Sequence, residues 1–114
     1  MARNGMEGTS LIVTGRLRIK PDRREVALAA ALALAEASCA EQGCHEFRVF
    51  NDAADPYVLV FFEVWNSVDA MTRNFQTFYM TQFHESAKAF AVGELEVKRY
   101  VVTPVAPSVS QLAS

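Results

Sequence analysis

The sequence contains little cysteine and no long hydrophobic run. Only two of its 114 residues are cysteines, so it does not resemble the small secreted domains that disulfides hold together. The longest apolar stretch, residues 26–35, is about half as long as a membrane-spanning helix of about 20 residues. We therefore expect a cytoplasmic protein with two buried, reduced thiols and no membrane partner.

An excess of positive charge is also missing. The chain has 11 lysines and arginines against 13 aspartates and glutamates, for a net charge of −2, and the two signs are interspersed. Without a basic face, nucleic acid is not an expected partner. A hydrophobic fraction of 51% with 21% charged residues is typical of a single globular domain of this length.

Motifs for common cofactors and nucleophiles are absent as well. The sequence has no P-loop, no glycine-rich dinucleotide loop and no nucleophile elbow. Cys39, Cys44 and His45 lie close together, but their spacing differs from that of known zinc sites. We expect no metal and no cofactor.

What the sequence does contain is a regular alternation of strands and helices. Period-two patterns predict strands at 10–20, 44–52, 57–65 and 94–102. Helices are expected from an Asp22 cap to about residue 42, from a Ser67 cap to Phe75, and from a Thr77 cap to about Val92. The expected domain covers residues 10–103, with a flexible leader at 1–9 and a flexible tail at 104–114.

Two details of these elements are expected from local patterns. The first helix should pack closely on a sheet through its alanines, with a stripe formed by Leu28, Leu32 and Cys39. The two middle strands should form a hairpin that turns at Asp55 and Pro56, with a loop longer than the tightest kind.

The order β-α-β-β-α-α-β is that of an α+β, ferredoxin-like split βαβ fold with an antiparallel sheet covered by helices on one face. The other face would mix charged and aromatic side chains. Because such a chain has more apolar surface than one helix layer can cover, we expect a homodimer that packs through this face. Its predicted residues are Arg16, Arg18, Glu46, Arg48, Phe50, Glu96, Lys98 and Tyr100.

Four segments in this order resemble one protein family. They are "IKPDRRE" at 19–25, "EQGCHEFRVFND" at 41–52, "FFEVWNS" at 61–67 and "NFQTFYM" at 74–80. Together they are similar to the antibiotic biosynthesis monooxygenases, and most of all to their bacterial quinol monooxygenase branch, over about residues 11–103. The resemblance implies a dimeric α+β barrel with a cavity between sheet and helices in each subunit. It also implies oxidation of a phenolic, quinol or polycyclic aromatic molecule by O2 without metal or flavin.

The same resemblance indicates the site residues. Relatives carry a His-Leu-Gln-Thr-Pro-His segment, and this chain has Asn74 and Tyr79 at its two histidines. We expect Tyr79, Asn74 and Trp65 to be catalytic, with Tyr79 facing the sheet near Trp65 and donating to a bound oxyanion. The substrate-binding residues are expected to be Phe75, Phe83, His84 and Glu63.

Two alternatives stay open. His84 lies at about the position of the iron-ligating histidine of haem-degrading relatives, although Gly15 and Asn74 replace two other residues of that site. The loss of both family histidines also favours a non-catalytic dimer that binds a small molecule.

Overall fold

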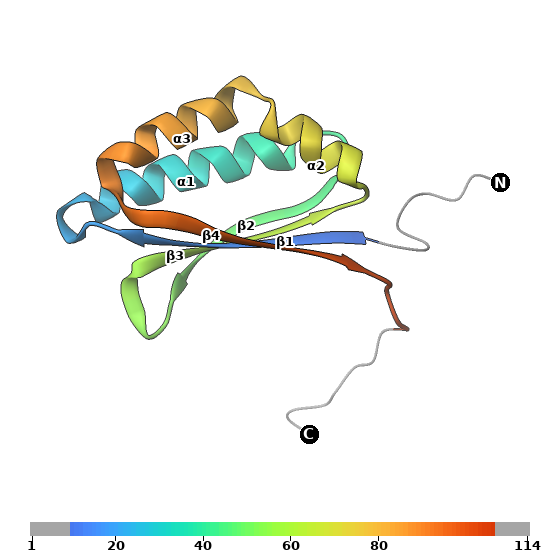
Figure 1. Cartoon of the computed structure of the whole chain (residues 1–114), viewed down its shortest axis with the longest axis horizontal. Coiled ribbons are helices and arrows are strands. Elements are labelled where there is room, and N and C mark those ends of the chain that lie inside the picture. The colour runs from blue at the N-terminus through green and yellow to red at the C-terminus, as the bar shows by residue number, and fades with distance from the viewer. Residues whose placement is uncertain (1–9, 107–114) are drawn as a thin grey trace.

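A computed structural model describes residues 10–106, and the predicted leader and residues 107–114 of the predicted tail lie outside this part. Four strands and three α-helices follow the predicted order (Figure 1). The first half contains β1 (Ser10–Ile19), a 3-10 turn at Pro21–Arg23, α1 (Arg24–Cys39), β2 (Cys44–Asp52) and β3 (Asp55–Trp65). The second half contains α2 (Val68–Phe75), α3 (Phe78–Phe90) and β4 (Ala91–Val102).

The strands form one antiparallel sheet in the order β2-β3-β1-β4. All three helices cover the same face of this sheet, and α1 and α3 lie side by side (Figure 1). This confirms the ferredoxin-like α+β fold. None of the helices within residues 10–106 is long and apolar enough to cross a membrane.

Helix α1 packs on the sheet through small side chains. Ala27, Ala31 and Ala35 are buried, as expected for a helix whose backbone approaches a sheet closely. The predicted stripe is wrong, because Leu32 is 53% exposed and Cys39 is exposed. The expectation of two buried thiols fails with it, since Cys44 is only partly buried.

The N-terminal caps of α2 and α3 follow the predictions, but that of α1 does not. Ser67 accepts a hydrogen bond from the Ala70 N–H, and Thr77 accepts one from Met80. Asp22 caps nothing, because it lies within the 3-10 turn that precedes α1. Helix α1 also ends three residues before the predicted position, at Cys39, and α3 ends two residues early, at Phe90.

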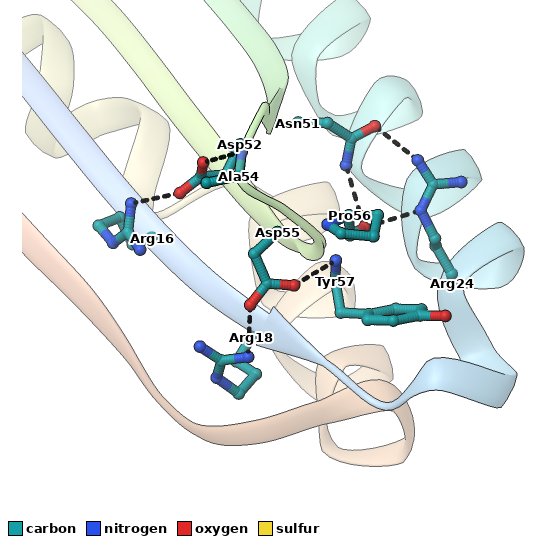
Figure 2. A network of polar contacts seen from close by, with 9 residues as sticks. All are labelled: Arg16, Arg18, Arg24, Asn51, Asp52, Ala54, Asp55, Pro56 and Tyr57. Carbon is teal, nitrogen blue, oxygen red and sulfur yellow. Dashed lines mark hydrogen bonds and ion pairs between the residues drawn. The ribbon is translucent and has the colours of Figure 1, made fainter.

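The β2–β3 hairpin is tighter than predicted. Asp52 pairs with Asp55 across a two-residue loop, so Asp55 and Pro56 belong to β3 and do not form the turn. Side chains from β1 and α1 reach this end of the hairpin (Figure 2). Arg16 and Arg18 bind Asp52 and Asp55 at 3.4 and 2.9 Å, and Arg24 binds the Pro56 carbonyl and the Asn51 amide oxygen at 2.8 and 2.7 Å.

The face of the sheet that carries no helices is more apolar than the sequence suggested. Because directly paired residues share a face, the register places Val60 opposite Arg16, Phe62 opposite Thr14 and Val64 opposite Ile12. The predicted charged residues lie around this strip. Since Arg16 and Arg18 are already paired with acids of the same chain, much of the charge on this face is balanced locally.

Candidate functional site

A small cavity lies between the inner face of the sheet and the helices. Its volume is about 30 Å³, enough for about one or two water molecules and too small for an aromatic ring. Among its lining residues, Glu63 and His84 are polar. The sheet contributes Val13, Gly15, Phe47, Phe61, Glu63, Leu95 and Val97, and the helices contribute Leu34, Phe75, Met80, Phe83 and His84.

The floor of the cavity includes Gly15. Without a side chain, this residue presents its backbone to the cavity. A Cβ atom at this position would lie 3.4 Å from Leu95 Cδ1 and 3.6 Å from Phe61. Leu95 therefore covers the backbone of Gly15 from the edge strand.

Glu63 is the ionisable group of β3 in the cavity wall. Its carboxylate accepts a hydrogen bond from the Trp65 indole N–H at 2.9 Å. Burial raises the pKa of Glu63 from 4.5 to about 7, and the bond from Trp65 and the charge of Arg99 oppose that rise. A carboxyl group with a pKa near neutrality can accept and return a proton at physiological pH.

The neighbours of Glu63 are set by strand register. Phe47, Glu63, Val13 and Arg99 form one row across the four strands. The Arg99 guanidinium lies 5.3 Å from the centre of the Phe75 ring, a favourable cation–π distance. Phe75 lines the cavity, so Arg99 brings a positive charge to its rim.

Trp65 supports the site from behind. Its ring is fully buried and meets Phe47 edge-on, with ring centres 6.5 Å apart. Trp65 does not line the cavity. It orients Glu63 through the hydrogen bond from its indole N–H.

The structure brings together the four residues predicted to bind substrate. Glu63, Phe75, Phe83 and His84 all line the cavity. Phe83 is buried and meets Phe61 edge-on with ring centres 5.8 Å apart. His84 is exposed to solvent, as a helix-surface histidine would be, and still forms part of the wall.

Asn74 and Tyr79 belong to a different polar cluster. Asn74 is 2% exposed and donates to the Ser38 hydroxyl at 3.0 Å. The Tyr79 hydroxyl donates to Glu41 at 2.6 Å, and burial, followed by the bond to Glu41, raises the Tyr79 pKa. Neither residue lines the cavity. The prediction that Tyr79 faces the sheet fails because its hydroxyl binds a carboxylate beyond the end of α1.

This geometry changes the result expected for Tyr79→Phe. The variant loses the bond to Glu41 and should lose about 1 kcal/mol of stability, with little change in ligand affinity. Thermal melts and ligand titrations check both parts, with the exposed Tyr57→Phe on β3 as the matched control. A large loss of ligand affinity with an unchanged melting temperature would show that Tyr79 does contact the ligand.

Sequence reasoning missed Arg99 and Leu95, although a signal for both was present. Glu96, Lys98 and Tyr100 were assigned to the uncovered face, so the alternation of β4 already placed residues 95, 97 and 99 on the helix-covered face.

Among residues 10–106, no group of three or more His, Cys, Asp or Glu side chains is placed to hold a metal ion.

The four-stranded sheet and the helix layer, with an aromatic cavity between them, define a ferredoxin-like α+β domain. Residues 10–86 match the antibiotic biosynthesis monooxygenase family. The chain belongs to that family, as its sequence motifs implied.

The chain is similar to three known proteins. It is 30% identical over 92 residues to the uncharacterized protein sll1783 of Synechocystis, covering 81% of this chain but only 63% of that relative. YcnE of Bacillus subtilis, named as a proposed monooxygenase, is 26% identical over 89 residues, covering 78% of this chain and 94% of its own. A solved structure from Deinococcus radiodurans, named as a proposed antibiotic biosynthesis monooxygenase, superposes with a TM-score of 0.81 at 20% identity, covering 88% of this chain and 99% of that one. That last likeness concerns the fold alone.

Proposed function

We propose that the protein is a cytoplasmic, homodimeric and cofactor-free monooxygenase that oxidises a phenolic or quinol-type aromatic molecule with O2. One observation carries the proposal: a carboxyl group with a pKa of about 7 lies in the wall of an otherwise apolar cavity and is oriented by an indole N–H. Monooxygenase-like function is that of the family to which the chain belongs.

The chemistry requires few protein groups. Ionised Glu63 takes the proton of a bound phenol, and the electron-rich phenolate then passes an electron to O2. Net, a quinol and O2 give a hydroxyquinone and water, with one oxygen atom joining the ring. The Arg99 charge at the rim favours the anion, and the exclusion of water by Phe61, Phe75 and Phe83 strengthens that attraction.

The test is oxygen uptake by the purified, chelator-treated protein with a panel of naphthoquinols and substituted phenols, while quinone formation is followed by absorbance. Uptake and quinone in equal amounts above the buffer rate support the proposal. Binding without uptake would identify a non-catalytic small-molecule-binding protein. A Soret band on titration with hemin would favour the haem reading, for which His84 supplies an exposed imidazole.

The uncovered face of the sheet supports the proposed homodimer. Phe62 and Val64 are only half-buried there, and Phe50 and Tyr100 are 49% and 47% exposed. Covering such a face with a second copy removes the apolar patch from water.

We expect Phe62→Lys to convert a dimer into a monomer at micromolar concentration, because the substitution would bury a charge in the interface. Sedimentation velocity measures the change. Val26→Lys, at a 57% exposed position of α1, should leave the mass unchanged. A monomeric wild-type protein would contradict the dimer directly.

A further inference from the structure

The small volume of the cavity poses a physical problem for any aromatic ligand. At about 30 Å³ it is far below the roughly 300 Å³ at which ligand pockets begin. Some wall residue must therefore move before a ring can enter. The structure indicates which one.

A second hollow lies directly outside the cavity, between α3 and β4. Its volume is about 250 Å³. It shares Phe83, His84 and Leu95 with the cavity, so these three side chains separate the two spaces. Of the three, Phe83 is fixed in the core by Phe61 and Phe90. Leu95 is only partly buried, at the margin of the core.

The backbone around Leu95 is irregular. Arg16 pairs with Glu96 and Arg18 pairs with Val92, so that residues 93–95 of β4 oppose Leu17 alone. Such a bulge interrupts the strand pairing and bends the bulged strand. Gly93 begins it with a φ of +74° and no atom within 4 Å of where its Cβ would lie. Strand pairing therefore restrains β4 least beside the side chains that separate the cavity from the outer hollow.

We propose that ligands enter between α3 and β4, and that Leu95 is the residue that sets the size of the ligand; this inference rests on the proposed function. In the structure, Leu95 Cδ1 lies over the backbone of Gly15. Rotation of the Leu95 side chain toward the outer hollow joins the two spaces and uncovers Gly15. A flat bicyclic phenol can then lie on the glycine backbone with its hydroxyl directed toward Glu63.

The test compares 2-naphthol with the wider 9-phenanthrol by equilibrium dialysis. Leu95→Trp should weaken 2-naphthol binding by about tenfold or more, and Leu95→Ala should improve the affinity for 9-phenanthrol relative to 2-naphthol by about tenfold. Gly15→Ala, whose added Cβ makes ordinary contacts, should weaken both ligands. Leu32→Trp and Leu32→Ala, at a 53% exposed leucine of α1, are the matched controls, and melts verify that each variant folds.

Unchanged 2-naphthol binding by folded Leu95→Trp, or an unchanged ratio of the two affinities in Leu95→Ala, would overturn the proposal. Xenon NMR separates this failure from that of the proposed function, because xenon reports the cavity without a phenol. A saturable xenon signal that grows in Leu95→Ala and disappears in Leu95→Trp supports the proposal that Leu95 limits the size of the cavity, even if no phenol binds. Equal xenon binding by all three proteins overturns it.

Discussion

Glu63→Gln is expected to stabilise the protein by about 2 kcal/mol at pH 8 and to destabilise it by about 1 kcal/mol at pH 4. The reason is that the folded state raises the pKa of this carboxyl from 4.5 to about 7, chiefly by burial. Below pH 4.5 the Glu63 carboxyl is protonated in both the folded and the unfolded state, so it does not lower the stability of the protein. Between pH 4.5 and 7 the unfolded chain loses its proton first, so the stability of the wild-type protein falls.

Above about pH 7 the full cost is present, about 3 kcal/mol from the size of the shift. Glutamine carries no charge and keeps an oxygen that can accept the hydrogen bond from the Trp65 N–H. Its amide hydrogens need partners, however, which lowers the stability of the variant at every pH.

Urea unfolding of both proteins at one fixed concentration, between pH 4 and pH 8, measures the difference. Glu36→Gln, at an exposed position of α1, keeps Glu63 and should therefore retain the pH dependence of the wild-type protein. Parallel stability curves for wild type and Glu63→Gln across this range would show that Glu63 is not buried as described.

The fold could be predicted because its signals are local. Strict alternation identifies the strands, and Ser67 and Thr77 form the predicted helix caps. The buried face of α1 could not be predicted in the same way. All its residues from Val26 to Ala35 are apolar, so the pattern favours no side, and packing against the sheet selects the alanines over Leu32.

The candidate site was predictable where strand or helix geometry fixes a direction. Glu63 and Trp65, two residues apart on one strand, had to share a face, and the structure joins them by a hydrogen bond. The partner of Tyr79 depends on Glu41, which lies 38 positions away in the sequence. Nothing local to either residue indicates that contact. The β4 bulge and the small volume of the cavity likewise arise only from the assembled sheet and helices.

Opposite effects on stability and activity are expected at the same residue. The ionised form of Glu63 destabilises the fold, yet only that form can accept a proton from a phenol. A buried group that costs stability in its reactive state is typical of functional sites. The pH range in which the wild-type protein loses stability should therefore be the range in which it gains activity.

If the proposed activity holds, we expect kcat/KM of the wild-type protein to rise with pH and to level off above about pH 7, following ionisation of Glu63. Glu63→Gln should lower kcat/KM by a factor of about 10²–10⁴ and remove this inflection. Arg99→Gln should move the inflection to higher pH, because the charge of Arg99 now lowers the Glu63 pKa. Glu36→Gln is again the control.

Oxygen uptake with a quinol from the active panel, measured between pH 5 and pH 9, checks all four proteins. The phenol's own ionisation is separated by repeating the series with quinols of different pKa. An inflection that belongs to Glu63 stays in place as the substrate changes, whereas one that belongs to the substrate moves with it. A Glu63→Gln protein that keeps both the wild-type rate and the inflection would exclude this carboxyl as the base and leave His84 as the remaining titratable group of the cavity wall.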